Sequence, residues 1–405
     1  MSPRIPALIC LAALTALAAG PVAAAQSFEK NDSYKNPAIK AGGSLTLTNM
    51  LGHVSVVAAT DGVLTVDSKV VTAAGSDADA QALAAKIKFE TTSTDGGKGV
   101  EMMTKYPLDE STDYYYHGYG FNFGMSTTST SYDGERVHIS NGSFGSGLNL
   151  HVDFVVHVPK GVHVTVDNKV GMIEASGVDA PLSLKSSSGD IKSDKGADSF
   201  SADTGSGDVT VTDQAGKVEM HSGSGDLILT RQKGGDVTIK TGSGDVKLKD
   251  VAGTVNGETG SGDVTVDGYT GTGAELETGS GDIILTGATG SMKLSTGSGD
   301  IRGTGIKAGQ VVSTSTGSGS VNLDGDFGDV IRLNADSGSG DIVIHTSRVP
   351  SLHISATSDS GDVDVDLPGM SNVSAHSHSI RADVNGAKGS AELEAGSGDV
   401  TFTKN

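Results

Sequence analysis

Apolar and polar positions alternate in short runs through residues 166–405, and each run follows a glycine-rich phrase such as TGSGDV. The residue directly after the S-G-D of each phrase is aliphatic, and the residue two places further is usually apolar as well. A period of two predicts β-strands that turn one face inward. The first of these inward positions holds Ile191, Val209, Leu227, Val246, Val264, Ile283, Ile301, Val321, Ile342, Val363 and Val400. A second alternating pair precedes each phrase, so every repeat supplies two strands joined by a bend.

The phrases return at nearly constant intervals. From Asp190 to Asp362 the steps are 18 to 21 residues, and a last step of 37 to Asp399 is interpreted as two periods with a degenerate copy near Ser379. A period near 20 predicts a solenoid. Four buried aliphatic side chains contribute roughly 6 to 12 kcal/mol per coil, whereas ordering about 18 residues costs roughly 18 to 36 kcal/mol. Stacking on neighbouring coils must supply the difference. The predicted fold is therefore an all-β, single-chain β-solenoid (β-helix-like) with about 18–21 residues per coil and one short N-terminal helix.

The bend between the two strands of a coil has its own pattern. Its two glycines predict backbone angles that other residues avoid. The Thr four residues before the aspartate, as in Thr241 and Thr259, falls on the inward side. We expect its hydroxyl to bond to backbone groups at the corner, because an unpaired buried hydroxyl is costly.

Stacking the repeats places the aspartates from Asp190 to Asp300 in one column. Carboxylates about 4.8 Å apart repel by roughly 0.9 kcal/mol per pair in water, so something must offset this repulsion. One interpretation is that each carboxylate accepts hydrogen bonds from backbone N–H groups of its own bend. A second is weak binding of divalent cations such as calcium. Calcium-binding nonapeptide repeats place one residue between glycine and aspartate, whereas these two residues are adjacent in this chain.

Residues 26–165 predict an N-terminal β region that continues into the solenoid. One amphipathic helix is expected near 77–89, capped by Ser76, and is expected to cover the open end of the solenoid. A long alternating strand over 148–158 leads into the repeats.

An aromatic stretch at 106–135 interrupts this region and shows no clear period. It predicts a long surface loop, either folded back on the sheet or exposed for contacts with proteins or glycans. The candidate partner-binding side chains are Tyr114, Tyr115, Tyr116, Tyr119, Phe121 and Phe123.

Residues 1–25 read as a secretory signal peptide with a small basic start, an apolar stretch and Ala-Ala-Ala before Gln26. The only cysteine, Cys10, lies within it. The expected organisation is thus a signal peptide at 1–25, the N-terminal β region at 26–165 and the repeats at 166–405. The formal net charge of −20 disfavours nucleic acids, which require clustered basic residues. No cofactor motif, catalytic constellation or convincing metal site stands out, so catalytic, cofactor and metal sites are all predicted to be absent.

Several of these features together resemble the putative-adhesin or toastrack family of exported bacterial proteins, a domain of unknown function. They are the signal segment, the opening LTLTNMLGHVSV, the helical insertion at 77–89, the strand LNLHVDFVVHVPKGVHVTV and the repeated TGSGDVTV. The resemblance implies a β-solenoid in the cell envelope, with a role in adhesion or envelope-stress sensing and no established catalytic residues.

The resulting expectation is a noncatalytic, adhesin-like binding or presentation protein. It is expected in the periplasm, at the cell surface or outside a bacterium, with an envelope protein, glycan or surface as partner. The alternative is a periplasmic scaffold or stress-sensing module whose open C-terminal coil pairs with another strand or a second copy as a homo-oligomer. A polysaccharide-active enzyme is third.

Overall fold

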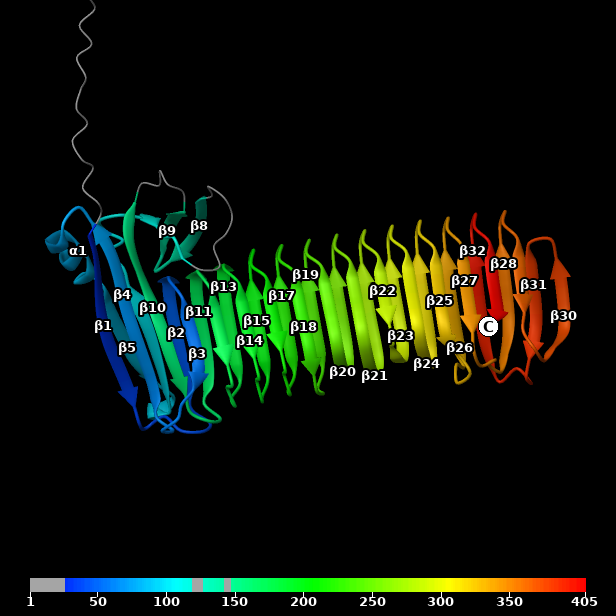
Figure 1. Cartoon of the computed structure of the whole chain (residues 1–405), viewed down its shortest axis with the longest axis horizontal. Coiled ribbons are helices and arrows are strands. Elements are labelled where there is room, and N and C mark those ends of the chain that lie inside the picture. The colour runs from blue at the N-terminus through cyan, green and yellow to red at the C-terminus, as the bar shows by residue number, and fades with distance from the viewer. Residues whose placement is uncertain (1–25, 119–126, 142–146) are drawn as a thin grey trace, which may run out of the picture.

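The computed structural model describes residues 26–118, 127–141 and 147–405, which form one long rod (Figure 1). The predicted signal peptide at 1–25 lies outside these residues. Strands stack along the rod in two rows, and successive strands of the repeats alternate between them. The prediction of an all-β solenoid with one short helix is confirmed.

One row, here row A, follows the pairings from the N-terminal end to the far end of the rod. It contains β5 (Lys88–Thr94), β6 (Gly99–Lys105), β2 (Ser44–Leu51), β11 (His163–Val170), β13 (Leu182–Ser188), β15 (Phe200–Thr204), β17 (Val218–Ser222), β19 (Val237–Thr241), the second halves of β20 (Val246–Thr259) and β21 (Val264–Thr278), β23 (Thr289–Thr296), the second half of β24 (Ile301–Thr316), β26 (Arg332–Ser337), β32 (Gly389–Ala395), β28 (Leu352–Ser358), β31 (Ser379–Val384) and β30 (Met370–His376).

Row B lies opposite and runs the same length. It contains β1 (Gln26–Asn36), β4 (Leu64–Ala74), β10 (Leu148–Val158), β3 (Val54–Ala58), β12 (Ile173–Ser176), β14 (Ile191–Asp194), β16 (Val209–Thr212), β18 (Leu227–Gln232), the first halves of β20, β21 and β24, β22 (Ile283–Thr286), β25 (Val321–Asp326), β27 (Ile342–Thr346), β33 (Val400–Lys404) and β29 (Val363–Asp366). Three short strands, β7 (Asp113–Tyr115), β8 (Thr127–Tyr132) and β9 (Glu135–Ser140), extend from β10.

The core is the narrow space between the two rows. The predicted inward column is buried from Ile191 to Ile342 and at Val400. Val363 is only partly buried, because β29 is the last strand of row B and has a neighbour on one side only. Parallel pairing in register stacks like residues on like, as in Val209 beside Leu227. The alternation in the sequence therefore identifies the core correctly.

The bends between the rows confirm the role of the threonines and correct that of the glycines. Thr241 donates its hydroxyl to the carbonyl of Gly225 (2.9 Å) and accepts from the N–H of Gly244 (3.3 Å), and the same pair of bonds recurs in neighbouring coils. The prediction of unusual backbone angles is wrong, since Gly225 and Gly244 have no positive φ. Glycine is required because a Cβ at Gly225 would collide with the carbonyl oxygen of Gly207 in the preceding coil.

The aspartate column is a continuous ladder between coils. The Oδ1 of Asp208 accepts the backbone N–H of Asp226 (2.8 Å), and the Oδ1 of Asp226 accepts that of Asp245 (2.9 Å). Each carboxylate therefore bonds to the next coil rather than to its own bend, which corrects the first interpretation. The donated N–H groups and basic neighbours such as Lys247 (3.0 Å from Asp245) offset the repulsion between carboxylates.

The end of the chain does not form the end of the rod. Strands β32 and β33 insert between β26 and β28 and between β27 and β29. The expected degenerate coil near Ser379 is wrong, because β31 runs antiparallel to β28 and forms a hairpin with β30. The terminal strand β33 thus has partners on both sides, and the predicted open C-terminal coil does not exist.

Candidate binding surface at the N-terminal end

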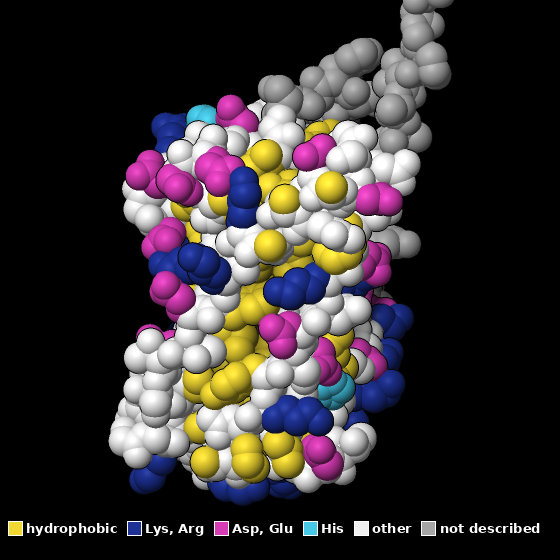
Figure 2. All heavy atoms as spheres, turned by 90° about the vertical axis from the view of Figure 1, so that its left-hand side faces the viewer, with side chains coloured by type: hydrophobic (Ala, Val, Ile, Leu, Met, Phe, Trp, Pro, Cys, Tyr) yellow, Lys and Arg dark blue, Asp and Glu magenta, His cyan; other side chains and the backbone are white. Residues whose placement is uncertain are grey.

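The N-terminal end of the rod leaves its core partly open. The last strands there are β1 in row B and β5 in row A, and among the described residues each pairs on one side only, with β4 and β6 respectively. We call the gap between them the end groove. Hydrophobic side chains form a band down the middle of this end of the molecule, flanked by polar and charged groups (Figure 2).

Helix α1 (Asp77–Ala84) closes only one part of this end. Ser76 caps it as predicted, accepting the N–H of Asp79 (3.2 Å). The carbonyl of Ala80 accepts the hydroxyl of Thr72 (2.9 Å), and Thr72 lies opposite Phe28 in the β1–β4 register. The helix therefore packs near the Phe28 end of β1, which leaves the Tyr34 end open.

The open part of the end groove has a volume of about 200 Å³. Its apolar lining consists of Tyr34, Val66, Phe89 and Met102, and its polar lining of Asp32, Ser33, Ser68 and Thr91. The Phe89 ring packs edge-on against Phe154, with ring centroids 5.9 Å apart. Val66 and Met102 are almost fully buried, so they form a fixed floor, whereas Tyr34 and Phe89 are partly exposed at the rim.

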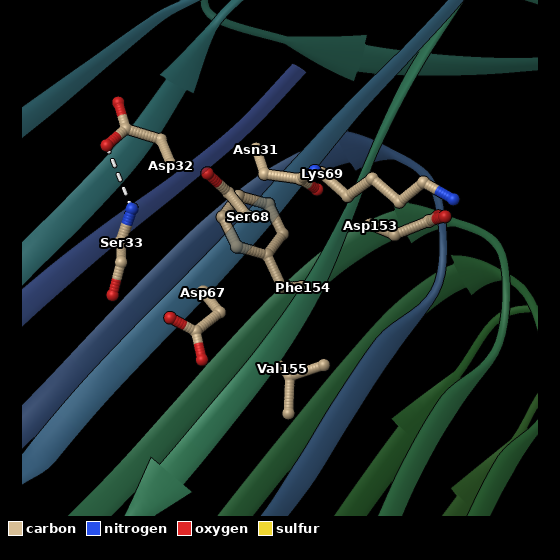
Figure 3. A pocket seen from close by; sticks show the side chains of 9 residues that line it. All are labelled: Asn31, Asp32, Ser33, Asp67, Ser68, Lys69, Asp153, Phe154 and Val155. Atoms are coloured by element: carbon tan, nitrogen blue, oxygen red, sulfur yellow. Dashed lines mark hydrogen bonds between the residues drawn. The ribbon is translucent and has the colours of Figure 1, made fainter. Parts of the chain in front are cut away.

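A shallower hollow of about 700 Å³ adjoins the end groove across β1, β4 and β10 (Figure 3). It shares Asp32, Ser33 and Ser68 with the groove and adds Asp67, Lys69, Asp153 and Val155 among others. Its charges are largely paired: Lys69 contacts Glu29 (2.6 Å) and Asp67 contacts His157 (3.2 Å). Most of the surface that lines this hollow is nonetheless apolar, and the hollow adjoins the groove.

The sequence-predicted aromatic site is placed differently from what we expected. Tyr114 is fully buried and Tyr116 is 2 % exposed, so the expectation that these two rings face a partner is wrong. Tyr115 is half-buried on β7, and Tyr119, Phe121 and Phe123 lie outside the described residues. Partner binding by the aromatic stretch stays a prediction. Among the candidate side chains in the described part of the chain, only Tyr115 is accessible to a partner.

The buried tyrosines instead form an internal cluster. Tyr106 stacks edge-on with Tyr114 (5.8 Å) and Tyr132 (5.9 Å), and its hydroxyl donates to the carbonyl of Leu51 (2.9 Å). Burial raises the pKa of Tyr106, Tyr114 and Tyr132 well above the usual range. The aromatic stretch therefore includes part of the core.

The end groove was not predicted from the sequence, because β1 lacks a clear alternation of apolar and polar residues. Phe28, Lys30, Asp32 and Tyr34 share the inward parity of this strand, as their β4 partners show. Two of the four are charged, so the alternation that marks a half-buried strand is lost. A signal was nonetheless present in the Phe and Tyr six residues apart, flanking a Lys and an Asp.

The geometry of the described residues adds no support for a cation site on the aspartate ladder. Within the described ranges, no group of three or more His, Cys, Asp or Glu side chains is arranged to hold a metal ion. Cation binding by the aspartate ladder stays a prediction.

The same part of the chain contains no helix of the length and apolarity needed to span a membrane.

Comparison with protein families matches the Toastrack DUF4097 model twice, at residues 132–256 and 213–352. Together these matches cover more than half of the 405 residues. The chain belongs to the toastrack family. The resemblance seen in the sequence is thereby confirmed.

Two solved structures are similar to this toastrack chain. One is a protein from Clostridium sporogenes ATCC 15579 described as a putative cell adhesion protein, with 10% identity, 94% of this chain and 100% of that chain covered, and a TM-score of 0.18. The other is a putative adhesin from Bacteroides fragilis NCTC 9343, with 9% identity, 93% and 97% covered, and a TM-score of 0.25. No curated protein matches the chain.

Proposed function

We propose that this toastrack protein is a noncatalytic, exported protein of the cell envelope that acts as an adhesin-like binding protein. The observation that supports this proposal is the end groove, an apolar surface open at one end of a rod. Exposed apolar patches with a polar rim are typical of interaction sites. In this proposal the long solenoid is a spacer that separates the end groove from the far end of the rod.

The faces of the rod suit a spacer better than a binding surface. Many of their charges pair between neighbouring coils, as in Lys240 with Glu258 (2.7 Å) and Lys293 with Glu275 (2.6 Å). Surface pairs of this kind contribute little stability, and they offset part of the acidic excess of the chain. The end groove differs in two ways. In the described part of the chain, the outer edges of β1 and β5 have no neighbouring strand, and the apolar side chains between them are not covered by another element.

The chemistry of the end groove favours an extended polypeptide as its ligand. The edges of β1 and β5 offer backbone N–H and C=O groups, and the apolar floor can receive alternate side chains of an added strand. The proposed partner is therefore a protein of the envelope that presents an extended segment. The scaffold alternative required an open C-terminal coil and is not proposed, because β33 is enclosed by β27 and β29.

Saturable binding of the mature chain to envelope proteins tests this proposal. Thr91 is exposed on β5 and lines the groove, whereas Thr92 is exposed on the opposite face of the same strand. We expect Thr91→Glu to abolish binding by placing a charge in the groove, and Thr92→Glu to bind like the parent. No saturable binding by the parent, or equal binding by both variants, would refute the proposal.

A further inference from the structure

The outer edge of β1 carries two charges that form no ion pair in the described part of the chain, although the Oδ1 of Asp32 accepts the backbone N–H of Ser33 (2.8 Å). Lys30 and Asp32 are exposed, and neither forms an ion pair there. Both lie on the inward parity of the strand, between Phe28 and Tyr34. The four side chains follow one another along the inward side of β1 in the order aromatic, basic, acidic, aromatic, and Asp32 and Tyr34 line the open part of the end groove. Inward-pointing charges on an edge strand usually prevent pairing with another chain, but this order permits one particular pairing.

The sequence of β1 is complementary to itself when it is reversed about Asn31. Antiparallel pairing about a twofold axis at Asn31 sets Lys30 opposite Asp32 of the second copy, and Phe28 opposite Tyr34. Both ion pairs and both aromatic pairs then fall on the groove side of the sheet, where directly opposed side chains are close enough to interact.

The two neighbouring registers that preserve the inward parity are unfavourable. Centring the pair on Lys30 sets that ammonium against its own copy, and centring it on Asp32 opposes two carboxylates. Like charges directly opposite each other destabilise a strand pair, so the charges select the register centred on Asn31. A shift by one residue would exchange the inward and outward faces.

The same twofold axis would close the end groove. An axis perpendicular to the sheet continues row B of one copy into row B of the other and brings the two β5 edges to face each other. The apolar linings of both grooves, including Tyr34 and Phe89 of each copy, would then share one interior. The two rods point away from each other in this arrangement. Most of their net charge of −20 each thus lies many Debye lengths from the contact.

We infer that two copies of this protein associate head to head, with β1 of each copy pairing antiparallel about Asn31 and closing the end groove. This inference rests on the proposed function and names a second copy of the chain as the extended segment that the groove receives. Adhesion between cells would then be homophilic, with each rod presenting the same end.

Charge exchange on β1 tests the register. The mature chain should sediment at twice the monomer mass. Lys30→Glu or Asp32→Lys alone should raise the dimer dissociation constant about tenfold or more, since both ion pairs become repulsive. The double variant Lys30→Glu/Asp32→Lys should restore it. Lys35→Glu, on the outward face of the strand, should leave it unchanged. A monomeric parent, single variants that dimerise normally or a double variant that stays monomeric would overturn the inference.

A cysteine at the axis gives a second test that does not depend on affinity alone. The predicted mature chain has no cysteine. Asn31→Cys should form an intermolecular disulfide under mild oxidation, because residues at the axis face each other within disulfide range. Lys35→Cys should not, since its own copies would lie about 27 Å apart along the strands. Equal cross-linking of the two variants would contradict the register.

The two proposals can fail separately. A chain that remains monomeric but binds an envelope protein saturably, with Thr91→Glu impaired, would refute the head-to-head pair and support the proposed function. A dimer that follows the charge exchange but shows no saturable binding to envelope proteins or to cells presenting the same chain would refute adhesion and support the pair.

Discussion

The Oδ1 of Asp282 accepts the backbone N–H of Asp300 at 2.8 Å, so a side chain of one coil is bonded to the main chain of the next. This bond is the largest cause of the lowered pKa of Asp282, and Arg302 (2.7 Å) lowers it further. At the start of the ladder, Asp190 also accepts a backbone N–H (3.1 Å), but burial dominates there and raises its pKa.

These opposite shifts predict opposite responses to neutralisation. Asp282 stabilises the fold above its ordinary pKa of 3.8, and this contribution is lost as the pH falls through the lower folded value. Asp282→Asn should therefore lower the free energy of unfolding at pH 7 by no more than about 1 kcal/mol, because solvent screens the site, and the melting temperature should fall with it. Asp190→Asn should leave it unchanged or raise it, since ionised Asp190 is disfavoured in the fold. Thermal melts from pH 3 to 7 measure both, and a loss of stability in Asp190→Asn equal to that in Asp282→Asn would contradict this account.

The spacing of the coils predicts which glycines tolerate a methyl group. Gly225→Ala would drive a Cβ into the carbonyl of Gly207, forcing two coils apart at a cost of about 3 kcal/mol or more. Gly273→Ala meets no atom within 4 Å and has no positive φ, so it should change stability by less than about 1 kcal/mol. Calorimetry of the two variants tests whether glycine is needed because neighbouring coils approach closely or because the backbone must be flexible. Equal melting temperatures would show that the glycines serve another purpose.

The buried threonine hydroxyls predict a contrast between two isosteric substitutions. Thr241→Val removes the bonds to Gly225 and Gly244 and should cost about 1–3 kcal/mol, because it leaves buried backbone groups unpaired. Thr314 is also buried, but its hydroxyl has no partner in the described structure. Thr314→Val should therefore be neutral or stabilising. Urea unfolding of both variants provides the comparison, with Thr241→Ser as the control that retains a hydroxyl.

The tyrosine cluster allows the same comparison within the aromatic stretch. Tyr106→Phe loses the bond to Leu51 and should destabilise the chain by about 1 kcal/mol. Tyr114→Phe removes a buried hydroxyl that has no partner in the described structure, so its stability should be equal or higher. Neither variant should change binding to envelope proteins, because both rings are buried. Reduced binding in Tyr114→Phe with unchanged stability would indicate that the aromatic stretch forms the partner-binding site.

The sequence predicted the repeat unit well because its physics is local. Alternation around S-G-D identifies Val209 and Val264 as core residues, and an inward Thr such as Thr241 needs backbone partners wherever the bend lies. The reason for Gly225 could not be read in this way, since the atom it avoids belongs to another coil. Nor could the insertion of β33 between β27 and β29, because every S-G-D phrase is compatible with every other.

The candidate site escaped prediction for a related reason. A binding end is defined by strands that lack a neighbour, and no local pattern shows where stacking stops. Tyr114 and Tyr116 attracted attention through their composition, yet packing against β10 and the neighbouring rings buries them. Lys30 and Asp32 gain significance only when β1 is known to be an edge strand.

Hydrogen–deuterium exchange of the mature chain, free and engaged with its partner, tests the central claim most directly. We predict that engagement slows exchange at the amides of β1, residues 26–36, and β5, residues 88–94, and leaves the amides of the solenoid from 173 to 404 unchanged. Protection along the faces of the rod or within 106–118, with β1 and β5 unaffected, would show that the end groove is not the binding surface.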